Sequence, residues 1–143
     1  MNLKKLLLLP LMALLLLPTG CRKEYITYGS QVRSHFYTVK ANHWVKPAKA
    51  NYYVSRWENA DITPDVVDAN GAVVAYVFNN GTWCSMPYVY PYYSADYDVT
   101  IAENYRLEYS EGYVYFILED LDGALPEYIE NLPDVEFKVS VIK

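Results

Sequence analysis

The chain has 143 residues, a hydrophobic fraction of 52% and a formal net charge of −5 at pH 7. Because Lys4 and Lys5 lie within the first twenty residues, the remainder of the chain is still more acidic. An acidic chain has no electrostatic attraction to nucleic acid or to anionic lipid surfaces, so we expect neither as a binding partner. The length corresponds to one domain with a core of its own.

The first twenty residues have the organisation of an export signal. Lys4 and Lys5 form a positive segment without an acid, and residues 6–17 are an apolar run. A run of this length fits a signal-peptide core and is shorter than the ~20 residues of a membrane-spanning helix. The pattern predicts a signal peptide over residues 1–20. A buried Leu-rich helix of a cytosolic protein is the alternative.

A cysteine follows this segment directly. Thr19 and Gly20 are small residues immediately before Cys21, and the segment resembles the lipobox of bacterial lipoproteins, although Pro18 stands where leucine is common. The resemblance implies cleavage before Cys21, a diacylglyceryl group on its thiol and, often, acylation of the new amine. Two or more acyl chains suffice for stable membrane attachment, since each buried CH₂ contributes ~0.8 kcal/mol. The alternative is an ordinary signal peptide with a cysteine nearby by chance.

Beyond Cys21 the sequence favours a β-rich domain. Residues 21–33 are polar without clear periodicity, and we expect them to tether the lipid to a domain over residues 34–143. After lipidation of Cys21 only Cys84 remains as a thiol, so no intramolecular disulfide is available and the fold depends on its core. Tyrosine is the compositional outlier, with 16 residues, and it favours strands.

The first predicted elements of this domain are strands. Residues 35–41 and 51–57 alternate with the period of a strand, and Trp44, Pro47 and Ala48 mark a loop between them.

Residues 62–71 break the strand pattern. Thr63 is a favourable N-cap, Pro64 suits the first helical position, and Gly71 can take the left-handed conformation that ends a helix. We therefore predict one short helix near residues 63–69. Two strands joined by an Asn-Gly turn at residues 70 and 71 are the alternative.

Residues 72–78 are continuously apolar and predict a central strand, which Asn79-Asn80-Gly81 turns into a strand over residues 82–86. Tyr88-Val89-Tyr90 then lies between Pro87 and Pro91. Because proline cannot donate to a ladder, this segment is expected at a sheet edge or in an extended loop, held out of regular pairing.

The clearest predicted hairpin joins residues 99–109 to residues 113–118 through a turn at Ser110-Glu111-Gly112. Residues 119–133 are expected to form an acidic loop, and residues 135–141 alternate as a closing strand with one solvent-exposed face.

About seven short strands predict a single antiparallel β-sandwich-like domain with at most one short helix. The side chains expected in its core are Val73, Val77, Phe116, Leu118, Phe137, Val139 and Val141.

Several of these segments together resemble small lipoproteins of Bacteroidetes-type bacteria: residues 62–68, 73–77, 86–88, 109–115 and 137–142, with Gly71 and Trp83. The resemblance implies a lipid-anchored, β-rich domain in the cell envelope, at the outer membrane. It brings no catalytic residues. Acidic residues just after the lipidated cysteine favour outer-surface display in those bacteria, and Arg22-Lys23-Glu24 offers one acid, so either leaflet stays open.

The residues with metal-binding or nucleophilic chemistry do not form a recognisable motif. His35 and His43, with Cys84, lack the spacing of a metal site or of a Cys/His nucleophilic pair. We expect surface or half-buried histidines and a buried, inert thiol, and no metal or other cofactor.

Acidic residues offer two further hypotheses. Asp120-Leu121-Asp122-Gly123, with Glu119 and Glu127 near, resembles a fragment of a calcium loop, but the third ligand position and the spaced glutamate are missing. An ordinary acidic turn is the simpler interpretation, and whether residues 119–127 bind a cation stays open. Glu119, Asp120 and Asp122 are also candidate carboxylates of a small envelope hydrolase, which would need two acids facing each other across a cleft.

The aromatic residues give the leading functional hypothesis. Trp83, Tyr88 and Tyr90 are the candidate binding residues, because exposed flat rings stack on sugars or anchor protein partners. Packing of most tyrosines against the core is the competing interpretation. The sequence thus favours a non-enzymatic, lipid-anchored envelope protein that binds a protein or glycan or acts structurally, with a small hydrolase as the alternative.

Overall fold

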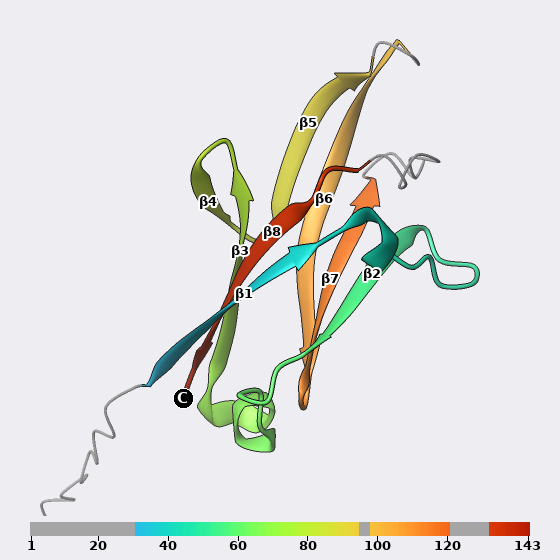
Figure 1. Ribbon diagram of the computed structural model, residues 1–143. Coiled ribbons are helices and arrows are strands. Elements are labelled where there is room, and N and C mark those ends of the chain that lie inside the picture. Colours follow the sequence, from blue (N-terminus) through green and yellow to red (C-terminus); the bar gives the residue numbers. More distant parts are fainter. Residues whose placement is uncertain (1–30, 95–97, 121–131) are drawn as a thin grey trace, which may run out of the picture.

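The computed structural model describes residues 31–94, 98–120 and 132–143, and over these residues it forms two four-stranded antiparallel sheets that face each other (Figure 1). The predicted β-sandwich-like fold is therefore confirmed. The first sheet has the order β1 (Val32–Val39), β8 (Val135–Ile142), β3 (Ala72–Asn79), β4 (Thr82–Ser85). The second sheet has the order β2 (Tyr52–Glu58), β7 (Tyr113–Asp120), β6 (Val99–Ser110), β5 (Tyr88–Ser94). The predicted signal peptide, Cys21, residues 22–30 of the tether and residues 121–131 of the acidic loop lie outside the described residues.

The first sheet is built around the last strand of the chain. β8 pairs with β1 on one side and with β3 on the other. Because β3 also pairs with β4, it is a central strand, as its continuous apolar sequence predicts. Along β8 the odd-numbered residues from Val135 to Val141 are buried, whereas Glu136 is exposed and Lys138 half-buried, which matches the predicted solvent-exposed face. Ser140 lies on that face but is buried, and its hydroxyl is 2.8 Å from that of Ser34.

The domain begins slightly earlier than the sequence indicates. Val32 and Arg33, which were expected at the end of the tether, pair with Ile142 and Val141 of β8. Backbone hydrogen bonds in both directions between Gln31 and Lys143 extend the pairing by one more residue. The start of β1 and the C-terminal end of β8 are thus held side by side (Figure 1).

The second sheet contains the predicted hairpin. β6 and β7 pair from Ser110 and Tyr113 outward, and Gly112 has φ +75° in the turn between them, a conformation that glycine adopts without strain. The β3–β4 hairpin of the first sheet likewise turns through Asn80 and Gly81, with φ +49° and +80°. Two consecutive positive φ angles are typical of the type I′ turns that Asn-Gly sequences favour.

The edge strand β5 corrects one prediction. Residues 88–90 do lie at a sheet edge, but they are not held out of regular pairing: β5 pairs with β6 in register over its whole length, with Pro91 opposite Ala102. A proline is compatible with β5 because an edge strand has one side without a ladder.

The core lies between the two sheets. Phe116 of β7 and Phe137 of β8 stack with ring centroids 4.1 Å apart and an interplanar angle of 14°, and both are fully buried. Trp44, from the loop between β1 and β2, is buried and packs its ring against Phe137 at 6.4 Å. Of the side chains predicted to be buried, all are buried except Val73, which is half-buried at the margin of the core.

The helical elements of the described residues are short. A 3-10 turn covers Ala41–His43 (η1), and the predicted helix near residues 63–69 is a helical turn ending in Val66–Asn70 (η2), which excludes the alternative pair of strands. The carbonyl of Thr63 accepts hydrogen bonds from the amides of Val66 and Val67. None of the described helical segments has the length and apolar composition that crossing a bilayer requires.

The role predicted for Gly71 is wrong. Its φ of −129° is extended rather than left-handed, so the turn does not end in a left-handed residue. Glycine is needed there for space, because a Cβ would lie 2.7 Å from the carbonyl oxygen of Ile142 and 3.0 Å from Cα of Val66. The close approach of two backbones therefore selects glycine at this position.

Candidate functional site

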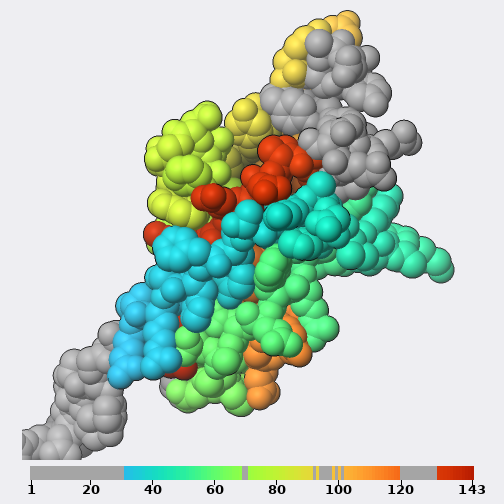
Figure 2. Space-filling model, in the orientation of Figure 1, coloured from blue at the N-terminus to red at the C-terminus, as the bar shows by residue number. Residues whose placement is uncertain are grey.

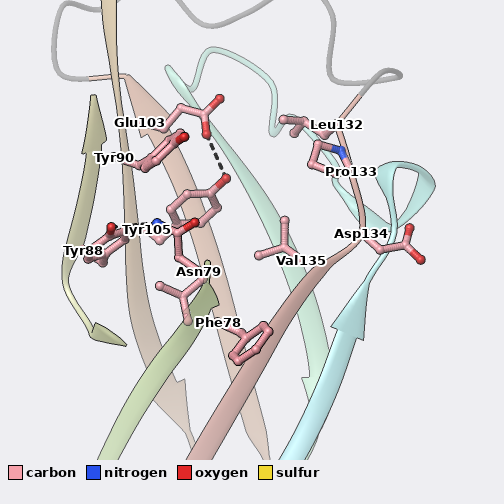
Figure 3. A pocket seen from close by; sticks show the side chains of 11 residues that line it. Phe78, Asn79, Tyr88, Tyr90, Glu103, Tyr105, Leu132, Pro133, Asp134 and Val135 are labelled. Atoms are coloured by element: carbon pink, nitrogen blue, oxygen red, sulfur yellow. Dashed lines mark hydrogen bonds between the residues drawn. The ribbon is translucent and has the colours of Figure 1, made fainter. Parts of the chain in front are cut away.

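A cavity of about 440 Å³ opens at one end of the sandwich, where β3, β5 and β6 meet the chain that enters β8 (Figure 3). Its volume lies in the range of roughly 300–1,000 Å³ that small-molecule sites occupy. Below it is called the tyrosine pocket. Its lining residues come from both sheets: Val77, Phe78, Asn79, Tyr88, Tyr90, Glu103, Tyr105, Leu132, Pro133, Asp134 and Val135.

The pairing of β5 with β6 brings the tyrosine and glutamate side chains of this lining next to one another. Tyr88 and Tyr90 are two residues apart on β5, so their side chains leave the same face of the strand. Tyr88 is opposite Tyr105 and Tyr90 is opposite Glu103. Side chains of directly opposite residues lie in contact distance, so two adjacent cross-strand pairs form one wall of the pocket.

Glu103 is the most unusual residue of this wall. It is only 5% exposed, and its Oε2 accepts a hydrogen bond of 2.8 Å from the hydroxyl of Tyr105, which is itself buried. Figure 3 shows this bond and the ring of Tyr90 on the same side of the cavity. Burying a carboxylate is costly unless partners compensate it, so a buried acid in a cavity marks a candidate binding or catalytic group.

Tyr88 ties the pocket wall to the other sheet. Its hydroxyl accepts a hydrogen bond of 2.9 Å from the side-chain amide of Asn79, at the end of β3. Tyr88 is half-buried, whereas Tyr90 is 37% exposed and presents part of its ring to solvent. One ring is therefore fixed by a contact between the sheets, and the next is accessible.

The pocket contains two acids, but they do not face each other. Glu103 lies deep in the wall, and Asp134 is exposed just before β8. In Figure 3 the Asp134 carboxylate points away from the cavity and from Glu103. This geometry does not present the opposed carboxylates that a two-acid glycosidase uses.

Trp83 does not join the two tyrosines. It pairs with Phe78 across the β3–β4 hairpin, and its ring lies 5.0 Å from that of Phe78 and 5.8 Å from that of Phe36. Phe36 is on β1, so this cluster crosses the outer face of the first sheet, the face seen in Figure 2 with β1 in blue and the β3–β4 hairpin in yellow-green. The three candidate binding residues thus divide between the pocket and the opposite face of the first sheet.

The histidines and the cysteine have separate surroundings. His35 and Cys84 lie on β1 and β4, the two opposite edges of the first sheet. His43 is half-buried, with its ring edge against Trp57, and Cys84 is half-buried at the margin of the core rather than fully buried as expected. Within the described ranges no three His, Cys, Asp or Glu side chains gather as metal ligands would.

His35 belongs instead to an ionic cluster around Asp61. The Asp61 carboxylate lies 2.8 Å from Nε2 of His35 and accepts hydrogen bonds from Arg33 at 3.0 Å and Lys143 at 3.2 Å. The hydrogen bond with His35, followed by those charges, lowers the pKa of the Asp61 carboxyl below its usual value, against the opposing effect of burial. β8 runs from the tyrosine pocket at Val135 to this cluster at its C-terminal end, so the two lie at opposite ends of the sandwich.

The start of the predicted acidic loop is part of a strand. β7 continues to Asp120, and Glu119 accepts hydrogen bonds from Asn104 at 2.9 Å and Arg106 at 3.2 Å. Glu119 is therefore a partner of neighbouring strand residues and not a loop ligand. Asp122, Gly123 and Glu127, the remaining residues of the calcium and hydrolase hypotheses, lie outside the described residues.

Glu103 and Tyr105 are the site residues that the sequence interpretation missed. Both stand in the alternating pattern of β6 between Ile101 and Leu107, so Glu103 is an acid at a position that the strand period assigns to the inner face. An acid on an apolar face was the signal that could have identified the site.

Comparison of the chain with protein-family models, with curated proteins and with solved structures gives no match. The resemblance to small Bacteroidetes-type lipoproteins stays a prediction.

Proposed function

We propose that this chain is a lipid-anchored protein of the bacterial cell envelope that binds a small ligand, or one unit of a glycan, in the tyrosine pocket without transforming it. The observation that carries the proposal is the pocket wall formed by Tyr88, Tyr90, Tyr105 and the buried Glu103. Aromatic rings with a few convergent polar groups are the usual composition of a small-ligand site. Sugars suit such a wall, because their C–H faces stack on rings and their hydroxyls donate to a carboxylate.

The envelope location in this proposal rests on the sequence before the domain. Cys21, preceded by Thr19, Gly20 and the apolar run, supplies the attachment point, and the first strand begins at Val32. The proposal therefore places the domain within about a dozen residues of the membrane surface, at most ~3.3–3.6 Å of reach per residue.

We expect the mature N-terminus to be Cys21 with acyl chains attached, because lipidation and cleavage act on the same residue. Mass spectrometry of the native protein should find a mature chain that lacks residues 1–20 and carries the lipid mass. A Cys21→Ala variant should move from the membrane fraction to the soluble fraction. A variant that stays in the membrane fraction would show that the anchor is assigned wrongly.

The pocket predicts the effect of single substitutions on ligand binding. A glycan array and a pull-down with a soluble Cys21→Ser form should identify a ligand, and Tyr90→Ala should then weaken its binding about tenfold, since a packed aromatic contact contributes about 1–2 kcal/mol. Tyr93→Ala is the matched control. Tyr93 is three residues from Tyr90 on the same strand, so its side chain leaves the opposite face of the strand, and it is 62% exposed.

Trp83→Ala decides between the two aromatic surfaces. If the ligand binds in the tyrosine pocket, Trp83→Ala should weaken its binding much less than Tyr90→Ala does, because Trp83 is not a lining residue and touches the pocket only indirectly, through the ring of Phe78. Loss of binding in Trp83→Ala with normal binding by Tyr90→Ala would place the site on that outer face and contradict the pocket proposal.

A further inference from the structure

The tyrosine pocket combines a buried acid with aromatic rings. Resting on the proposed binding function, we propose that it selects ligands that carry a positively charged organic ammonium group, primary or quaternary, with Glu103 as the charge partner and Tyr90 as the ring that covers the cation. Four features of the pocket support this.

The first feature is the state of the Glu103 carboxylate. It is 5% exposed, and one of its oxygens accepts the Tyr105 hydroxyl at 2.8 Å. An acid so far from water interacts more strongly with an opposite charge than an exposed acid does. An organic ammonium group supplies that opposite charge, and a primary one also donates hydrogen bonds, whereas a neutral sugar hydroxyl only donates hydrogen bonds.

The second feature is the position of a ring beside that carboxylate. Tyr90 is directly opposite Glu103 in the β5–β6 ladder, and Tyr88 precedes Tyr90 by two residues on the same face of β5. An aromatic face attracts a cation placed over it, and cages of aromatic rings recognise quaternary ammonium ligands. Figure 3 shows the rings of Tyr90 and Tyr105 on the same wall as Glu103.

The third feature is the charge of the lining. Glu103 is the buried acid of the lining, Asp134 points away from the cavity, and the eleven described lining residues include no Lys, Arg or His. The field in the cavity therefore favours cations and opposes ligands that carry a carboxylate or phosphate. Among the described residues, Arg56 lies over Tyr113 at 3.7 Å, Arg106 over Tyr52 at 5.8 Å and Lys138 over Tyr76 at 4.4 Å, and none of these rings lines the pocket.

The fourth feature is the size and mixed character of the cavity. About 440 Å³ is ample for a monosaccharide-sized group, and Val77, Leu132 and Val135 add apolar surface to the lining. A bare metal ion would need several oxygen ligands around it, whereas an organic cation uses the rings and the apolar surface as well. Amino sugars and choline-type groups share this chemistry, and the experiment separates them.

The test uses ligand pairs that differ in charge and little else. Isothermal titration of the purified full chain compares choline with 3,3-dimethylbutan-1-ol, in which carbon replaces the charged nitrogen, and glucosamine with glucose. We expect at least one cation to bind about tenfold or more tightly than its neutral counterpart. The pair that shows the preference tells whether the ammonium group is quaternary or part of an amino sugar.

Two variants assign the preference to the pocket. Glu103→Gln keeps an acceptor for Tyr105 but removes the charge, so the preference for the cation should fall below about twofold while the neutral counterpart is unaffected. Glu111→Gln, in the exposed β6–β7 turn, removes the same charge from the chain and should keep the full preference. If Glu103→Gln fails to fold, the comparison of the paired ligands on the unmodified chain still decides, because it needs no variant.

Three results would overturn the inference. Equal binding of charged and neutral ligands would show that the pocket has no charge selectivity, and the proposed binding function would stand. A preference that survives in Glu103→Gln would show that another group recognises the cation. Absence of binding by all four probes would reject an ammonium ligand, and the array test of Tyr90→Ala would then judge the binding function independently.

Discussion

Replacing Phe137 by alanine is expected to lower the free energy of unfolding by roughly 3–5 kcal/mol, as large-to-small changes of buried aromatic residues do. Phe137 is fully buried and stacks on Phe116 at 4.1 Å, with Trp44 and Tyr105 packing their rings against it at 6.4 and 6.0 Å. The substitution removes the ring that joins the two sheets and leaves a cavity that four neighbouring strands cannot close without moving.

Urea unfolding measures this loss as a lower transition midpoint at an unchanged slope. Phe36→Ala is the matched control, because Phe36 lies on the paired strand β1 but is 67% exposed, and its removal should lower the stability by about 1 kcal/mol or less, through its ring contact with Trp83. A domain of this size has a total stability of about 5–15 kcal/mol, so the Phe137 variant should be close to unfolding at elevated temperature. A loss below about 1 kcal/mol would mean that the stacked pair is not central to the core.

Replacing Asp61 by asparagine is expected to destabilise the fold by roughly 1.5–3 kcal/mol, because it removes a charged acceptor that is shared by several donors. The Asp61 side chain is 12% exposed and joins the loop after β2 to Arg33 and His35 of β1 and to Lys143. Arg33 is 59% exposed, so its share is screened by solvent and salt, and the lower half of the range is the expectation in high salt.

The pH dependence of the same contribution has a definite sign. The folded state lowers the pKa of Asp61 below the usual 3.8, mainly through the hydrogen bond with His35. A carboxyl whose pKa is lowered by folding stabilises the folded state above the unfolded value and loses that contribution as the pH falls through the folded value. The difference in unfolding free energy between the wild type and Asp61→Asn should therefore shrink as the pH falls below about 4.

Chemical denaturation at a series of pH values between about 5 and 2 measures that difference. Asp68→Asn serves as the control, since Asp68 is an exposed acid of η2, and its difference from the wild type should stay small throughout. An Asp61→Asn difference that does not change over this range would show that the Asp61 cluster does not titrate as its contacts imply.

Much of the local structure follows from the sequence because its determinants are local. The alternation from Val135 to Val141 sets which side of β8 is buried, and the Asn80-Gly81 and Gly112 positions set two turns through their positive φ angles. The edge position of residues 88–90 follows from the flanking prolines. The same prolines do not prevent pairing, since an edge strand accommodates Pro91 within a regular ladder.

The candidate site was predicted only in part. Tyr88 and Tyr90 do line one pocket, but Trp83 lies on another face although only five positions separate it from Tyr88. Between them the chain leaves the first sheet after β4 and enters the second sheet at β5, through the cis peptide bond before Pro87. Nearness in sequence says little about a shared surface when the chain changes sheet between the residues.

The sequence by itself determined the strands, their inward faces and their turns, because strand period and turn conformation are properties of a few consecutive residues. Only the tertiary structure decided that the last strand, β8, lies in the middle of the first sheet, and that Glu103 of β6 and the residues before β8 share a cavity with the β5 tyrosines. The order of strands depends on which faces bury the most surface against each other at the lowest cost of loop closure, which is a property of the whole chain. For the same reason no local sequence pattern predicts that Asp61 pairs with Arg33, His35 and Lys143. These contacts form because the start of β1, the end of β8 and the loop after β2 meet at one end of the sandwich.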